Sequence, residues 1–287
     1  MTNRLELNWK LDGFVDEQRY YCSETPIDTQ SPPIPKIVLS NTVRSYTDID
    51  IEVGKTYYVC VSSVKNNVEK FSDVLTAVVK NIVTSALLHF NDDLTDESGK
   101  FWTARGTAAI SSEQSVSGGK SLKLNGGSIA TTNNLDFDFA DEDFTIEFFV
   151  NLGISFSGWG MAIAKRNSGA NYSPFLIAVN VSTNSIYFAL STTGSTWDVF
   201  DIFNGVLTAG QNHVAFCRSG TKAFGFVRGT KLLDKTISSA PLMTNTNAVT
   251  IGANDNGGEA MRGYIDEMKI TKGHALYTSN FVPSSSF

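Results

Sequence analysis

Two carboxylates beside one apolar segment are the side chains in this sequence best suited to acid–base chemistry. Asp143 precedes the segment 144–150, FTIEFFV, and Glu147 lies within it. In a strand, alternation places both carboxylates on one face, and four steps of about 3.3 Å separate their Cα atoms by about 13 Å. Glycosidic hydrolysis needs two carboxyl groups about 5 to 9.5 Å apart, and Thr145 occupies the position between them. We therefore predict that this pair does not cleave glycosides and that the chain is not an enzyme.

Other catalytic patterns are missing from the sequence. The three histidines, His89, His213 and His274, are far apart and have no matching nucleophile motif. The sequence contains neither a Gly-x-Ser-x-Gly elbow nor a glycine loop suited to phosphate. Each histidine is therefore interpreted as a structural residue.

Several aromatic residues lie in segments where a core residue is unexpected. Trp159, Trp197 and Tyr172 occur among glycine, serine and asparagine, which favour loops. Phe149 faces away from the inner layer of its strand, and Arg166 is a nearby source of polar contacts. Carbohydrate sites combine aromatic surfaces with a few polar groups, so these five residues are candidate carbohydrate-binding residues. The alternative is that each ring packs into the body of the protein as a plug.

Asp266 is the polar residue with the most unusual predicted position. In the segment 264–270, YIDEMKI, alternation places Asp266 on the same face as Met268 and Ile270, and it places Glu267 in water. A carboxylate directed at the core must be neutralised or hydrogen-bonded, because an unpaired buried charge is costly.

The sequence predicts that strands joined by turns position these residues. Short alternating runs recur between Gly, Asn and Ser turns, and helical periodicity is nearly absent. The predicted strands are 5–9, 19–22, 36–39, 54–64, 74–82, 87–90, 121–124, 144–150, 161–164, 175–179, 186–190, 213–218, 223–227, 249–251 and 264–270. This pattern predicts an all-β protein with a small sandwich at 1–82 and a larger jelly-roll sandwich at 83–287.

The first module resembles a fibronectin type III domain. Trp9 in the first alternating strand and the segment 54–59, GKTYYV, carry the resemblance. In this family another strand precedes the tryptophan strand, whereas only residues 1–4 precede it here. The resemblance therefore implies an anchoring module that lacks its first strand. Two outcomes stay open: another chain completes the unpaired edge, or the module's own linker covers it.

The second module resembles concanavalin A-like, laminin-G-like domains, which have the lectin and glucanase fold. Four ordered segments carry the resemblance: 144–150 (FTIEFFV), 212–220 (NHVAFCRSG), 249–252 (VTIG) and 263–270 (GYIDEMKI). The resemblance implies a structural calcium ion, held by Asp266 together with Asn91, Asp93 and Asp96 of the opening loop. Calcium prefers six to eight oxygen ligands, which such a loop supplies. The alternative is that Asp266 accepts backbone N–H bonds from that loop without a metal.

The end of the chain resembles the tails of such domains in bacteriophage virion proteins, through the segments 270–277 (ITKGHALY) and 280–283 (NFVP). This resemblance implies a virion protein, tail-associated and assembled in the host cytoplasm as a homo-oligomer with other virion proteins. The polar start, 1–10, does not resemble a signal peptide.

The amino-acid composition and the charge limit the classes of partner that we expect. The formal net charge is −6, with no cluster of basic residues and no apolar run long enough to span a membrane. Nucleic acid and membrane insertion are therefore not expected. Three hypotheses remain: a lectin-like protein that binds host-surface glycans, a capsid decoration or assembly protein without glycan binding, and, least favoured, a polysaccharide hydrolase.

Overall fold

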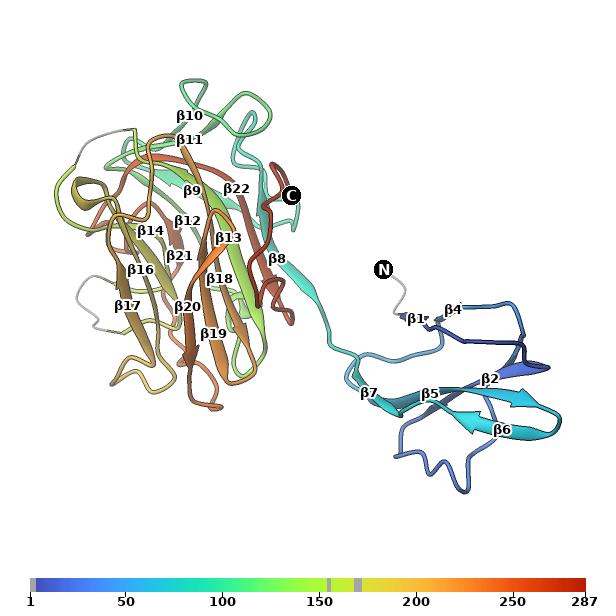
Figure 1. The fold of residues 1–287 in the computed structure, drawn as a ribbon. Helices are drawn as coiled ribbons and strands as arrows, with labels where there is room; N and C mark the ends of the chain where they lie inside the picture. The colour runs from blue at the N-terminus through green and yellow to red at the C-terminus, as the bar shows by residue number, and fades with distance from the viewer. Residues whose placement is uncertain (1–3, 154–155, 168–171) are drawn as a thin grey trace. The chain divides into compact units, whose positions relative to one another are not determined.

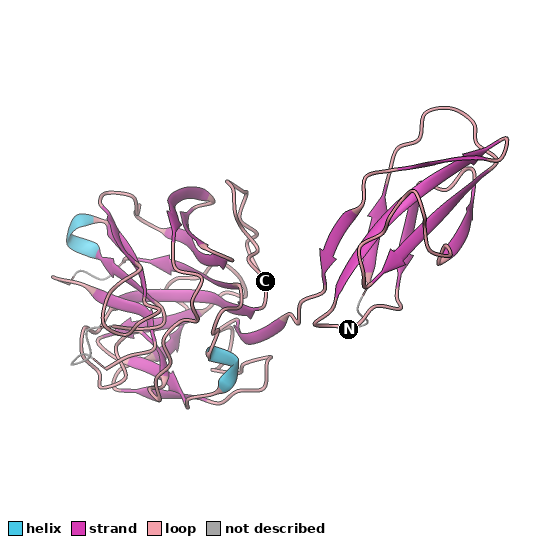
Figure 2. Ribbon diagram, turned by 90° about the horizontal axis from the view of Figure 1, so that it is seen from below, coloured by secondary structure: helices cyan, strands magenta, loops and turns pink. Residues whose placement is uncertain are grey.

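The chain forms two compact units, Met1–Asn81 and Ile82–Phe287, in a computed structural model that describes residues 4–153, 156–167 and 172–287. Both units consist of antiparallel strands (Figures 1 and 2). In the described ranges the helical segments are two short 3-10 turns, η1 (Leu135–Phe137) and η2 (Val181–Thr183). The predicted all-β class is therefore confirmed. None of the helices in those ranges is long and apolar enough to cross a membrane.

The N-terminal unit has two sheets. Its strands are β1 (Leu5–Asn8), β2 (Glu17–Ser23), β3 (Ile37–Ser40), β4 (Ser45–Asp48), β5 (Thr56–Lys65), β6 (Val68–Phe71) and β7 (Leu75–Val78). One sheet has the order β3-β2-β5-β6, with β7 also paired to β5. Among the described strands, β1 pairs with β4 alone, so the first sheet has only two strands. The indole Nε1 of Trp9 donates to Oε1 of the buried Gln18 at 2.7 Å, which ties the two sheets together.

The C-terminal unit is a sandwich of two larger sheets. The eight-stranded sheet has the order β10 (Ala109–Ser111), β11 (Ser121–Asn125), β22 (Arg262–Lys272), β13 (Phe144–Asn151), β18 (Gln211–Ser219), β19 (Lys222–Val227) and β20 (Thr230–Thr236), and β8 (Val83–Leu88) pairs with β22. The seven-stranded sheet has the order β17 (Val199–Phe203), β16 (Ser185–Leu190), β15 (Leu176–Asn180), β14 (Gly160–Ala164), β21 (Val249–Ile251), β12 (Ser128–Thr131) and β9 (Trp102–Arg105).

The main core lies between these two sheets. Alternate residues of β13, such as Phe144 and Phe148, meet Ile177 of β15 and Phe188 of β16, and all four are fully buried. Burying each such side chain contributes about 1.5 to 3 kcal/mol. The outward residues of β13 are also buried, because residues 273–287, which we call the C-terminal tail, pack over this sheet through side chains such as Phe281.

The register of β22 differs from the prediction. The pairing of β13 with β22 shifts between Glu147 and Phe149, where Glu267 adopts φ 47°. This bulge places Asp266 opposite Phe149, on the face away from the core that holds Met268. The prediction that Asp266 shares the face of Met268 and Ile270 was therefore wrong, and Glu267, predicted to lie in water, is 1% exposed.

Candidate functional site

Five aromatic rings form a connected cluster on the outer face of the seven-stranded sheet. The ring centroids of Trp159 and Tyr187 are 4.7 Å apart, and those of Tyr187 and Phe200 are 5.0 Å apart. Trp197 lies 5.7 Å from Phe200 and 5.2 Å from Tyr172. We call these five residues the aromatic patch. The three predicted loop aromatics are therefore brought together by Tyr187 and Phe200, which the sequence interpretation missed.

Strand geometry explains why the patch faces outward. Tyr187 of β16 precedes Phe188, which points into the main core, so Tyr187 points to the other face of the sheet. On that face it is directly opposite Ile202 of β17. The patch rests on a second, small apolar cluster made of Met161, Ala164, Leu176, Ala178 and Ala189. Phe200 is 46% exposed and the two tryptophans are only partly buried, so the patch presents ring surface to solvent.

Arg166 lies beside the patch but is already engaged. Its Nη2 forms an ion pair with Glu259, and its Nε donates to Oδ1 of Asn254 at 3.0 Å. Burial raises the pKa of the neighbouring Tyr187 to about 12, and the Arg166 charge acts in the opposite direction. Arg166 thus supplies a fixed polar border rather than a free cation.

Phe149 does not join the patch. It projects from β13, in the other sheet, and is 7% exposed. Its ring lies 5.0 Å from His213 and 6.1 Å from Phe287 of the C-terminal tail. The prediction that Phe149 faces away from the inner layer is correct, but the tail covers it, a contact that strand parity cannot reveal.

Asp143, which directly precedes β13, and Glu147 of β13 are held by structural hydrogen bonds. Asp143 Oδ1 accepts the N–H of Gly220 at 2.7 Å, and Glu147 Oε2 accepts the hydroxyl of Tyr277 at 2.8 Å. Glu147 is 1% exposed beneath the C-terminal tail. Neither carboxylate belongs to the aromatic patch.

The predicted calcium ligands do not fit a calcium ion. Asp96 uses both carboxylate oxygens to accept N–H groups from Leu87, Ser98 and the indole of Trp102. Asp93 is exposed at the surface and accepts the N–H of Thr95. In the described ranges, no three His, Cys, Asp or Glu side chains are grouped to hold a metal. Calcium binding therefore stays a prediction without support from these carboxylates.

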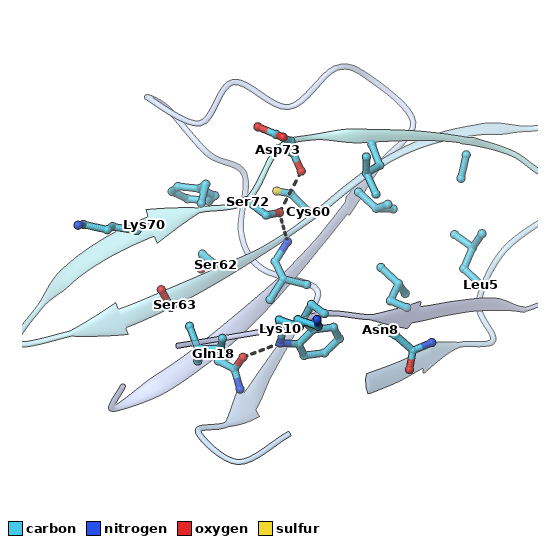
Figure 3. Close-up of a pocket in the computed structure, with 18 of the residues that line it drawn as sticks. Leu5, Asn8, Lys10, Gln18, Cys60, Ser62, Ser63, Lys70, Ser72 and Asp73 are labelled. Carbon is cyan, nitrogen blue, oxygen red and sulfur yellow. Dashed lines mark hydrogen bonds between the residues drawn. The ribbon is translucent and has the colours of Figure 1, made fainter. Parts of the chain in front are cut away.

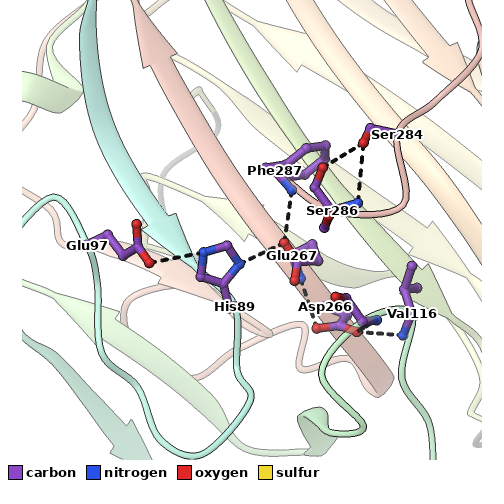
Figure 4. A network of polar contacts seen from close by, with 9 residues as sticks. His89, Glu97, Val116, Asp266, Glu267, Ser284, Ser286 and Phe287 are labelled. Atoms are coloured by element: carbon purple, nitrogen blue, oxygen red, sulfur yellow. Dashed lines mark hydrogen bonds and ion pairs between the residues drawn. The ribbon is translucent and has the colours of Figure 1, made fainter. Parts of the chain in front are cut away.

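Asp266 instead organises a neighbouring loop (Figure 4). Its Oδ2 accepts the N–H of Val116 at 2.6 Å, and its Oδ1 accepts the N–H of Glu267 at 3.0 Å. These donors lie in the loop at 116–117 and not in the opening loop, from which the alternative without a metal predicted them. Asn91, the fourth predicted ligand, has a buried Oδ1 that no donor reaches in the described part of the chain.

A groove of about 690 Å³ lies in the N-terminal unit, between β1 and the strands β5 to β7 (Figure 3). Consecutive residues of β1, from Leu5 to Asn8, line it, so the groove runs along the strand edge that does not pair with β4. Val59, Val61 and Leu75 give its other wall an apolar character.

Comparisons with known proteins place residues 124–276 within a family model described as the concanavalin A-like lectin/glucanases superfamily. No curated protein matches the chain. A similar solved structure is the binding domain of botulinum neurotoxin serotype G, with 12% identity and a TM-score of 0.53 over 68% of this chain and 49% of that chain. The binding domain of Paraclostridial mosquitocidal protein 1 has 17% identity and a TM-score of 0.52 over 69% of this chain and 50% of that chain. The binding domain of botulinum neurotoxin DC in complex with SialylT has 16% identity and a TM-score of 0.50 over 68% of this chain and 48% of that chain. The chain spans about half the length of these structures, and the likeness shows a shared fold.

Proposed function

Because the chain belongs to the concanavalin A-like lectin/glucanases superfamily through residues 124–276, we propose that its C-terminal unit binds glycans on the aromatic patch. The observation that carries this proposal is the continuous line of ring contacts from Trp159 to Tyr172 on one sheet face. An exposed aromatic surface with a polar border suits a sugar ring, which has an apolar C–H face and a polar rim.

The related structures support a binding role. Those compared above are described as binding domains, and one of them is in complex with SialylT. Asp143 and Glu147 favour the same role, because each is held by a hydrogen bond within the fold. We therefore propose that the protein binds a polysaccharide without cleaving it. Release of reducing ends from a bound polymer would contradict this part of the proposal.

A glycan array tests the binding proposal directly. We expect the full chain to bind a subset of printed bacterial polysaccharides and Trp197→Ala to bind them at least about tenfold more weakly, a loss of about 1.4 kcal/mol. The matched control is Phe14→Ala, which removes an aromatic side chain that is 89% exposed in the other unit. Equal binding by the wild type and Trp197→Ala would contradict the assignment.

At the level of the particle, we propose a bacteriophage virion protein, tail-associated, whose N-terminal unit is a fibronectin type III-like anchor. The groove beside β1 favours this second role, because a strand edge next to an apolar surface can accept an extended segment of another virion protein. A density map of the assembled particle tests it. A foreign strand hydrogen-bonded to β1 supports the anchor, whereas a solvent-exposed β1 edge contradicts it.

A further inference from the structure

We infer that the C-terminal unit carries a second glycan subsite, which takes a neutral sugar residue in a groove at the far end of the seven-stranded sheet from the aromatic patch. The groove has a volume of about 730 Å³. Its lining comes from three segments, namely Gly99, Lys100, Phe101, Thr103 and Arg105, residues 130–134, and Thr246, Ala248 and Asp255. The class of ligand rests on the proposed function, whereas the position rests on the geometry that follows.

The groove and the aromatic patch lie on the same face of the sheet. A row of directly opposed residues crosses all seven strands, in the order Thr103, Ala130, Thr250, Ala164, Leu176, Ala189 and Phe200. Opposed residues point to the same side of a sheet. The row begins in the groove, with Thr103 and Ala130, and ends in the patch, with Phe200.

The two regions are separate contact points. Six inter-strand steps of about 4.8 Å put the two ends of the row about 29 Å apart across the sheet. The central members, Thr250, Ala164 and Leu176, are fully buried. A ligand therefore cannot rest on the sheet between the two regions, but a polymer that spans this distance can touch both.

The lining of the groove suits a hydroxyl-rich ligand. Thr103, Thr132, Asn133 and Thr246 are all exposed and offer hydroxyl and amide groups that both donate and accept hydrogen bonds. Phe101 stands at the border with 92% of its surface exposed. A sugar ring has an apolar C–H face, which suits the ring of Phe101, and a rim of hydroxyl groups, which suits the uncharged polar groups.

The charges around the groove favour a neutral sugar over an acidic one. Nη1 of Arg105 donates to the backbone oxygen of Asp255 at 2.7 Å and lies 3.0 Å from its Oδ1. Nζ of Lys100 lies 2.8 Å from Oδ2 of Asp136. Both cations that line the groove are thus paired, and an acidic sugar would have to compete with these carboxylates.

A polymer held at both points should bind more tightly than a fragment held at one, because the second contact becomes intramolecular. The test uses the full chain and a printed array of neutral and acidic bacterial polysaccharides. Size-fractionated fragments of the polymer that binds most strongly are then titrated. We expect Phe101→Ala to weaken binding of the intact polymer about tenfold and to leave binding of two- or three-sugar fragments unchanged. Phe14→Ala again serves as the control, since it removes a ring of similar exposure in the other unit.

The variants separate this inference from the proposed function. Suppose that Trp197→Ala loses binding to both polymer and fragments, while Phe101→Ala keeps full binding to the polymer. This result overturns the second subsite and leaves the assignment of the aromatic patch intact. A preference for acidic over neutral polymers that is lost in Phe101→Ala overturns the neutral assignment. Absence of binding to every printed polymer by the wild type overturns the subsite together with the proposed function.

Discussion

At the level of single residues, the carboxylate of Asp266 has the most unusual protonation behaviour. Burial raises its pKa from 3.8 to about 6, while the backbone N–H groups of Val116 and Ser117 act to lower it. Between about pH 4 and pH 6 the folded protein therefore holds a proton on Asp266 that the unfolded chain has lost.

The free energy of unfolding should fall as pH rises through this window, by up to about 3 kcal/mol from this group. Asp266→Asn removes the titration, so its stability should depend less on pH between 4 and 6, although the amide cannot accept every N–H bond that the carboxylate accepts. Urea unfolding at a series of pH values measures the free energy of unfolding of the wild type and of Asp266→Asn. Parallel pH profiles for the wild type and the variant would contradict the pKa assignment.

Single residues also show the limits of sequence interpretation. The loop composition around Trp159, Trp197 and Tyr172 identified rings outside the core but not the strand residues that connect them. Phe200 was detectable in principle, because VFDIF at 199–203 alternates as an exposed strand does. Tyr187 was not, because its strand is apolar at nearly every position and shows no outward face. The face of Asp266 was mispredicted because the bulge at Glu267 uses a positive φ at a residue other than glycine, which no pattern reveals.

At the level of elements, the apolar and polar pattern of the sequence predicted several strands of the C-terminal unit correctly. The predicted strands 144–150, 223–227 and 249–251 match β13, β19 and β21 to within one residue at each end. These strands carry continuous apolar faces, so local pattern and tertiary burial agree. The C-terminal tail has no such pattern, and its position over Glu147 and Phe149 depends on contacts that are distant in sequence.

The tail should stabilise the eight-stranded sheet through one buried hydrogen bond. Tyr277→Phe removes the hydroxyl that donates to Glu147 Oε2, and the carboxylate then lies buried 3.4 Å from His213 Nε2. Leaving a buried charged group without its donor costs about 1 to 3 kcal/mol. Chemical unfolding should show this loss for Tyr277→Phe but not for Tyr58→Phe, whose hydroxyl has no hydrogen-bond partner within the described ranges. Equal stability of both variants would show that Tyr277 does not support Glu147.

At the level of the whole molecule, two separate cores predict two folding events. The buried cluster around Tyr20 and Val59 belongs to the first unit, and the cluster around Phe148 and Phe188 belongs to the second. We therefore expect scanning calorimetry to resolve two unfolding transitions. Leu39→Ala in the first core should lower the midpoint temperature of only one transition. A lower midpoint temperature for both transitions would indicate coupled units.

The indole N–H resonances of the four tryptophans provide the most direct test of glycan binding at the aromatic patch. Trp159 and Trp197 belong to the patch, whereas the indoles of Trp9 and Trp102 are hydrogen-bonded to Gln18 and Asp96 elsewhere. In a ¹H–¹⁵N titration with a two- or three-sugar fragment of the polymer that binds most strongly on the array, the resonances of Trp159 and Trp197 should shift. The resonance of Trp9, which lies in the other unit, should stay in place. Saturable binding that leaves Trp159 and Trp197 unshifted would contradict the account.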